Sequence, residues 1–475
     1  MKYQKILFII LIFTTPISSC NSQEQNPNNK RVIIQADIYP HAVTVPEMKC
    51  SSDSSQTYSY YLPKKYKITE KFPIIYVFDP KARGALAVNK FCNAAEKFGW
   101  IVIGSNIIRN KLTWQEIQRS LDVLFEDTYN KFSIDVRRVY TAGFSGGARV
   151  AASVAILSGN IEGVIACAAG LPNNSKPEKT NFEYIGCVGN ADFNYSEMQN
   201  LEARMNEWEM SNYFIYFNGK HDWSPDDVIM EAFERLEISA MKKGLVAKNA
   251  DLTSSLMNRL NAKISQNRNV GLPVDANIEY YMKIVSTFGG LIDVSEYKKL
   301  IYEHGNTNEY KSYIAQKKQF DSIEAEGRIR FSQAFNNKDF NQLKKMVQNL
   351  KKDIKSTKNT DKKFSLIRIQ STLSLLSFMY SINELNVGNI DNAKGFTDLY
   401  EMVDPENPDL HYLRARLSAA KGKLDEALDY LDKAVAAGYD DIATIDSDKV
   451  FEQLKNNDKF QTIQKGILKN RIEAK

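Results

Sequence analysis

A serine flanked by glycines is the strongest chemical signal in the sequence. Ser145 stands in the segment Gly143-Phe144-Ser145-Gly146-Gly147, a G-x-S-x-G pattern between a predicted strand and a predicted helix. Glycines at these places allow a turn so tight that the serine backbone is strained and its hydroxyl is presented at the end of the strand. A helix that begins at Gly146 points its amino end at the same place, which favours developing negative charge. The pattern predicts a nucleophilic serine.

A serine nucleophile needs a base, and the base needs an acid to orient it. The four histidines are His41, His221, His304 and His411. Of these, His221 lies in the loop after the last predicted strand of the first half of the chain, and Asp192 follows the strand before it. Because the carboxyl ends of parallel strands share one edge of a sheet, both side chains can meet Ser145 there. Asp222 is the rival acid, but its neighbour His221 cannot easily fold back onto it.

These positions depend on a segment in which short β-branched runs alternate with helical stretches. The predicted strands are Arg31–Ile38, Thr57–Leu62, Pro73–Phe78, Trp100–Ser105, Arg138–Gly143, Gly163–Ala168, Phe182–Val188 and Tyr213–Phe217. The predicted helices are Ala85–Phe98, Thr113–Asn130, Gly146–Ser158, Ser196–Met210 and Ser224–Lys243. Such alternation favours an α/β domain, over about 31–245, with a mostly parallel sheet flanked by helices.

The chain order Ser145, Asp192, His221, with the tight turn after the fifth strand, resembles the α/β-hydrolase family. It is most similar to the lidless esterases, such as the feruloyl- and acetylxylan-esterase, polyhydroxybutyrate-depolymerase and dienelactone-hydrolase groups. The resemblance covers roughly 58–243. It implies an α/β-hydrolase sheet and serine-dependent cleavage of an ester, thioester or amide through an acyl-enzyme, with no metal or organic cofactor. A carboxylic ester is the expected substrate, and a peptidase remains a possible variant.

The same resemblance implies an oxyanion hole made of two backbone N–H groups. The first follows the nucleophile and belongs to Gly146. The second follows the third strand, where the family often has His-Gly-X and this sequence has Asp79-Pro80-Lys81. Pro80 has no N–H to donate. Lys81 is therefore the expected donor, or Asp79 if the loop differs.

The second half of the chain has a different sequence pattern, with almost no strand signal from Asp251 to Lys475. Gly388 and Gly422 are 34 residues apart (422 − 388), and a helix–turn–helix repeat of 34 residues is the tetratricopeptide period. The segment Leu410–Tyr439 resembles that family. We expect an all-α domain over 250–475 with tetratricopeptide-like repeats near 376–440, or else a generic helical bundle. Repeats of this kind would support the fold or recruit a protein partner.

The N-terminus has the pattern of a secretory targeting signal. After a positive start, Ile6–Phe13 is an apolar run too short to span a bilayer. Ile17-Ser18-Ser19-Cys20 then resembles a bacterial lipobox. The resemblance implies a lipoprotein signal peptide over 1–19, lipidation of Cys20, a polar tether over 20–30, and attachment to a membrane of the bacterial cell envelope.

Composition sets broad limits on function. The 475 residues are 43% hydrophobic and 25% charged, as in globular proteins, and the net charge is +5. So small an excess does not point to nucleic acid, and we expect no nucleic-acid partner. Two hypotheses remain. The first is an envelope-anchored serine hydrolase. The second is a non-catalytic hydrolase-fold protein whose helical repeats bind a peptide or an envelope partner.

Overall fold

The computed structural model describes residues 38–173, 176–178, 181–269 and 277–473. The signal segment, Cys20, the tether and nearly all of the predicted strand Arg31–Ile38 lie outside these residues. The strands are β1 (Thr44–Lys49), β2 (Thr57–Tyr61), β3 (Phe72–Phe78), β4 (Ile101–Ser105), β5 (Ile134–Phe144), β6 (Gly163–Cys167), β7 (Glu183–Gly189) and β8 (Asn212–Phe217). Seven of these were predicted to within a few residues. β1 was not predicted.

The strands form one eight-stranded sheet in the order β1-β2-β4-β3-β5-β6-β7-β8. β1 pairs with β2, and β2 with β4, in antiparallel fashion, whereas β4, β3, β5, β6, β7 and β8 run parallel. β3 is buried along its whole length, as expected for a parallel strand covered on both faces. This strand order, with a serine turn after β5, is the α/β-hydrolase fold, and the predicted fold class is confirmed.

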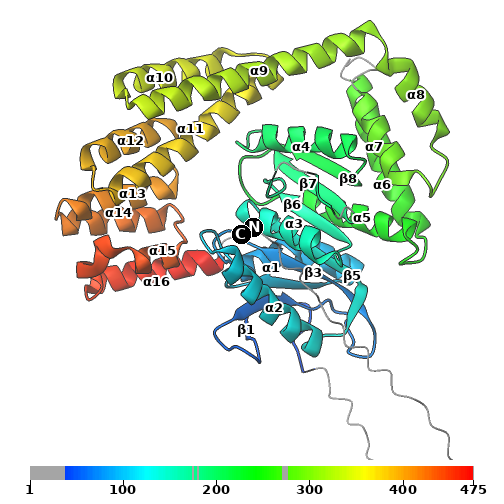
Figure 1. Cartoon of the computed structure of the whole chain (residues 1–475), viewed down its shortest axis with the longest axis horizontal. Helices are drawn as coiled ribbons and strands as arrows, with labels where there is room; N and C mark the ends of the chain where they lie inside the picture. The colour runs from blue at the N-terminus through cyan, green and yellow to red at the C-terminus, as the bar shows by residue number, and fades with distance from the viewer. Residues whose placement is uncertain (1–37, 174–175, 179–180, 270–276, 474–475) are drawn as a thin grey trace, which may run out of the picture.

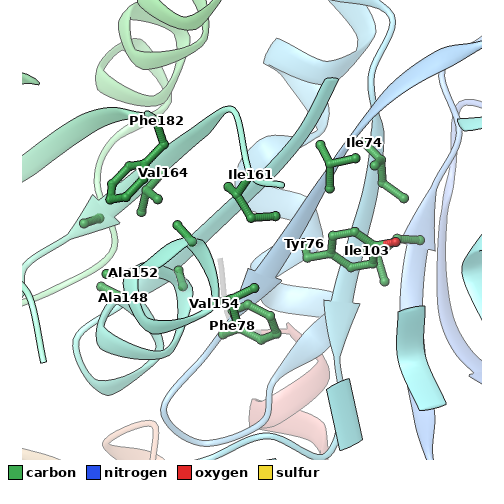
Figure 2. Packing of buried hydrophobic residues seen from close by; sticks show 14 of the residues in the cluster. Ile74, Tyr76, Phe78, Ile103, Ala148, Ala152, Val154, Ile161, Val164 and Phe182 are labelled. Carbon is green, nitrogen blue, oxygen red and sulfur yellow. The ribbon is translucent and has the colours of Figure 1, made fainter. Parts of the chain in front are cut away.

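Five helices cover the two faces of the sheet: α1 (Gly84–Phe98), α2 (Trp114–Lys131), α3 (Gly146–Ser158), α4 (Tyr195–Glu207) and α5 (Asp226–Lys242). Alternate residues of β3 serve opposite faces, because side chains of a strand alternate in direction. Ile74 and Tyr76 pack with α2, α3 and α4 in the cluster of Figure 2. Ile75 and Val77 pack with α1 and α5 on the other face.

The rest of the described chain is mainly helical, as predicted. It comprises α6 (Ala250–Asn269), α7 (Ile278–Phe288), α8 (Ser295–Gly305), α9 (Asn308–Asn337), α10 (Phe340–Ser356), α11 (Thr360–Asn386), α12 (Ile390–Val403), α13 (Pro408–Ala420), α14 (Leu424–Ala436), α15 (Ile442–Ser447), a 3₁₀ helix (Lys449–Leu454) and α16 (Asp458–Glu473). α6 and α7 pack against α5 through a shared apolar cluster. We call the helices α9–α16 the helical arm. Among the described residues, no helix combines the length and apolar character needed to cross a bilayer.

The helical arm curves away from the sheet and returns to it (Figure 1). The thirty-residue α9 leads outward, α11 to α14 form two successive hairpins, and α16 comes back to lie beside α1. Gly388 and Gly422 end the first helix of each hairpin in the left-handed region, with φ of 76° and 74°. Ala393 and Ala427 are fully buried where the hairpin helices meet. The 34-residue spacing thus corresponds to a helical hairpin that occurs twice in succession. The assignment of this hairpin to the tetratricopeptide family stays a prediction.

Candidate active site

Ser145 occupies a strained turn between β5 and α3. Its backbone has φ 52° and ψ −119°, a region that non-glycine residues rarely adopt. Two glycines make the turn possible. A Cβ on Gly143 would lie 2.3 Å from the backbone of Gly147, and one on Gly147 would lie 2.0 Å from the carbonyl oxygen of Phe78. The Ser145 N–H donates to the carbonyl of Cys167 at 2.8 Å, which ties the turn to β6.

The structure brings the three residues predicted from their spacing within hydrogen-bond distance of one another. His221 Nε2 lies 3.0 Å from Ser145 Oγ, and His221 Nδ1 lies 2.9 Å from each carboxylate oxygen of Asp192. With the Nδ1 proton donated to Asp192, Nε2 is left to accept the serine proton. Asp192 is fully buried, whereas the His221 side chain is 19% exposed. The imidazole therefore sits between a buried acid and an accessible hydroxyl.

Two aromatic rings and one backbone N–H hold this arrangement, and sequence reasoning did not find them. The rings of Phe144 and Phe193 lie 4.9 and 4.0 Å from the imidazole of His221, measured between centroids. The Asn194 N–H donates to Asp192 Oδ1 at 2.7 Å, alongside the bond from His221. The sequence does show an aromatic residue beside Ser145 and another beside Asp192. That their rings face His221 can be recognised only from the folded structure.

The loop after β3 departs from the expectation for the oxyanion hole. The N–H of Lys81 donates to the carboxylate of Asp79 at 2.8 Å, so it is already engaged. The prediction that Lys81 supplies the second donor is therefore wrong for this conformation. The cause is the acidic side chain two residues earlier, which turns the loop onto itself. The same carboxylate also accepts from Arg83 and from the indole of Trp223.

A side-chain amide that the sequence did not single out lies beside Gly146 instead. A Cβ placed on Gly146 would lie 1.9 Å from Asn110 Oδ1 and 3.4 Å from Asn110 Nδ2. The Asn110 backbone N–H donates to the carbonyl of Pro80 at 2.9 Å, which holds this residue against the loop after β3. The two ends of an amide are exchanged by a simple flip, so Asn110 offers either a donor or an acceptor at this place.

The strand order and the serine turn after β5 give this chain the α/β-hydrolase fold, and the site brings together Ser145, Asp192 and His221 in that chain order. No family model and no curated protein matches the chain. Solved structures that resemble it include FphF, a fluorophosphonate-binding serine hydrolase of Staphylococcus aureus, at 12% identity and a TM-score of 0.34 over 41% of this chain and 97% of that one.

Two further structures give similar values. S-formylglutathione hydrolase (FrmB) of Staphylococcus aureus is 13% identical, with a TM-score of 0.32 over 38% of this chain and 90% of its own. An esterase of Pyrobaculum calidifontis is 12% identical, with a TM-score of 0.33 over 42% and 86%. Likenesses this low carry no weight by themselves. The fold is defined by the strand order, and the site by its distances.

Proposed function

We propose that this chain is a serine hydrolase that cleaves a carboxylic ester through an acyl-enzyme. The observation that carries the proposal is the continuous hydrogen-bonded path from Ser145 through His221 to buried Asp192. His221 Nε2 takes the serine proton as Oγ attacks the ester carbonyl, and then gives that proton to the departing alcohol. Water, activated by the same imidazole, attacks the acyl-enzyme in the second half-reaction and releases the acid.

The negative oxygen of each tetrahedral intermediate needs hydrogen-bond donors. We propose the N–H of Gly146, at the amino end of α3, as one donor and the side-chain amide of Asn110 as the other. Loss of one such donor typically lowers kcat about 10²–10³-fold. Asn110→Ala should therefore lower kcat with little change in KM. An unchanged kcat would remove Asn110 from the oxyanion hole.

The test of the reaction class is covalent labelling by a fluorophosphonate probe, which reacts with activated serines. Wild type should be labelled and should hydrolyse 4-nitrophenyl acetate, whereas Ser145→Ala should do neither. Ser153→Ala is the matched control, because Ser153 lies on α3 and its hydroxyl only donates to the carbonyl of Arg149. Equal labelling of wild type and Ser145→Ala would contradict the proposal.

We also propose that the enzyme is held on a bacterial membrane by acyl chains on Cys20. Support comes from the sequence pattern Ile17-Ser18-Ser19-Cys20 alone. Acyl chains contribute about 0.8 kcal/mol per buried CH₂, enough for several chains on one residue to anchor a protein stably. Expression in bacteria fed a radioactive fatty acid should label wild type in the membrane fraction. Cys20→Ser should be unlabelled and leave that fraction, and a labelled Cys20→Ser would contradict the anchor.

A further inference from the structure

Side chains of the helical arm donate hydrogen bonds to the loop that carries Asp192. Three contacts flank Asp192 on both sides in sequence. They run from Arg368 Nη1 to the Asn190 carbonyl (3.0 Å), from Ser371 Oγ to the Ala191 carbonyl (2.9 Å) and from Arg328 Nη2 to the Phe193 carbonyl (2.7 Å). The donors belong to α9 and α11, more than a hundred residues away along the chain. The backbone on either side of the catalytic acid is thus held by another part of the molecule.

Arg368 is itself firmly oriented. Its Nε donates to Glu324 Oε2 at 2.6 Å, its Nη2 donates to Ser365 Oγ at 3.0 Å, and its guanidinium lies 4.3 Å from the ring centre of Tyr195 on α4. The side chains of Arg368 and Glu324 are 5% and 1% exposed. Burying charges of this kind adds little net stability compared with an apolar contact, so stability alone is a weak reason for the network. A buried guanidinium group with several hydrogen bonds instead fixes the orientation of the groups that it binds.

A second contact fixes the loop after β3. Asp440, which follows α14, accepts from Lys81 Nζ at 2.8 Å and from Arg83 Nη1 at 2.6 Å. Arg83 also donates to Asp79, whose carboxylate receives the indole N–H of Trp223, two residues after the catalytic histidine. The helical arm therefore also holds the loop after β3, which in turn contacts the segment just after His221.

The two contacts stand on opposite sides of the nucleophile. In the sheet order, β5 with Ser145 at its end lies between β3 on one side and β6 and β7 on the other. The helical arm holds the loop after β7 through α9 and α11 and the loop after β3 through Asp440. Figure 1 shows α9 starting next to α8 and α16 coming back beside α1. The helical arm thus connects the loop of the acid with the loop next to the oxyanion site.

We propose that the helical arm contributes to the active site. Its residues Arg368, Ser371 and Arg328 are positioning residues for the loop of Asp192. The proposal rests on the serine-hydrolase function proposed above. None of the three touches the reacting atoms. They act by keeping the Asp192 carboxylate where it holds His221, and displacement of a catalytic group by about 1 Å can cost about 10²-fold in rate.

The test compares two arginines of the arm in the full-length protein. Arg368→Ala removes the bond to the loop of Asp192. Arg416→Ala is the matched control, because Arg416 is also largely buried, at 12% exposed, and pairs with Asp448 at 2.7 Å within the arm. We expect kcat for 4-nitrophenyl acetate to fall about 10–100-fold in Arg368→Ala with KM within about twofold. Arg416→Ala should keep the wild-type kcat even where its Tm falls.

Two further measurements separate positioning from loss of structure. Guanidinium ion at millimolar concentration should restore part of the kcat of Arg368→Ala, because it can occupy the vacated place, and should not change that of wild type. Ser371→Ala removes a single hydroxyl and leaves the ion pairs intact, so it decides the matter if Arg368→Ala does not fold. Its kcat should fall about two- to tenfold, the value of one hydrogen bond.

The outcomes distinguish this proposal from the proposed reaction. If folded Arg368→Ala and Ser371→Ala react with the fluorophosphonate probe and the ester at the wild-type rate while Ser145→Ala is inactive, the hydrolase stands and the positioning role is wrong. An equal loss of kcat in Arg416→Ala would also overturn it, since general destabilisation would then explain the effect. If wild type is neither labelled nor active, both proposals fall together.

Discussion

Gly147→Ala tests how closely the serine turn is packed against β3. The added Cβ would lie 2.0 Å from the Phe78 carbonyl oxygen and 2.5 Å from its carbon, whereas ordinary contact begins at 3.4 Å. The neighbour is backbone in the centre of the sheet and cannot rotate away. Either β3 or the start of α3 must move by about 1.4 Å, the difference between the 3.4 and 2.0 Å distances. Overpacking of this kind costs about 1–3 kcal/mol of stability.

The same movement should be costly for the reaction, because α3 carries Gly146 and follows Ser145 directly. A misplacement of about 1 Å can cost about 10²-fold, so we expect kcat for 4-nitrophenyl acetate to fall about 100-fold or more. Thermal unfolding measured in parallel should show a lower Tm. Gly305→Ala is the control, since a Cβ there meets nothing within 4 Å and the residue has no positive φ. Wild-type kcat and Tm in Gly147→Ala would refute the described packing.

The remaining predictions concern the acid and the docking of the arm. Asp192→Asn should keep the geometry of His221 but favour the wrong tautomer, lowering kcat about 10⁴-fold with KM nearly unchanged in steady-state kinetics. Asp440→Asn weakens the bonds from Lys81 and Arg83 and should lower the free energy of unfolding by about 1.5–3 kcal/mol in urea titrations. Burial would raise the pKa of Asp440, but Lys81 and Arg83 outweigh burial and hold this pKa below its ordinary 3.8. The stability difference between wild type and Asp440→Asn should therefore be constant well above the ordinary pKa of 3.8 and be lost as the pH falls through the lowered pKa of Asp440. A difference that grows in acid would contradict this sign.

Much of the fold could be predicted because the core strands are continuous apolar runs. β3 and β4 are buried at every residue, and such runs are recognisable without any tertiary contact. β1 escaped prediction for the opposite reason. It is an edge strand with a bulge between Val45 and Met48 and a proline in its middle, and its residues are largely exposed or half-buried. Its place is decided by pairing with β2 rather than by its own composition.

The catalytic candidates could be predicted from order and spacing. Ser145, Asp192 and His221 each follow a strand of one parallel sheet, and the strands bring their carboxyl ends to one edge whatever lies between them. The sequence also determined the strained turn, because glycines at 143 and 147 are what a serine with φ 52° requires around it.

Only the tertiary structure decided the contacts that depend on the path of a loop or on side chains far apart in the sequence. The sequence shows Asp79 and Lys81 but not that the carboxylate captures the Lys81 N–H, which depends on the local path of the loop. It shows helical repeats but not that Arg368 reaches the loop of Asp192, 178 residues away at Asn190. Periodicity specifies which face of a helix is buried, whereas the partner of that face is set by how a curved stack of helices closes back on the sheet.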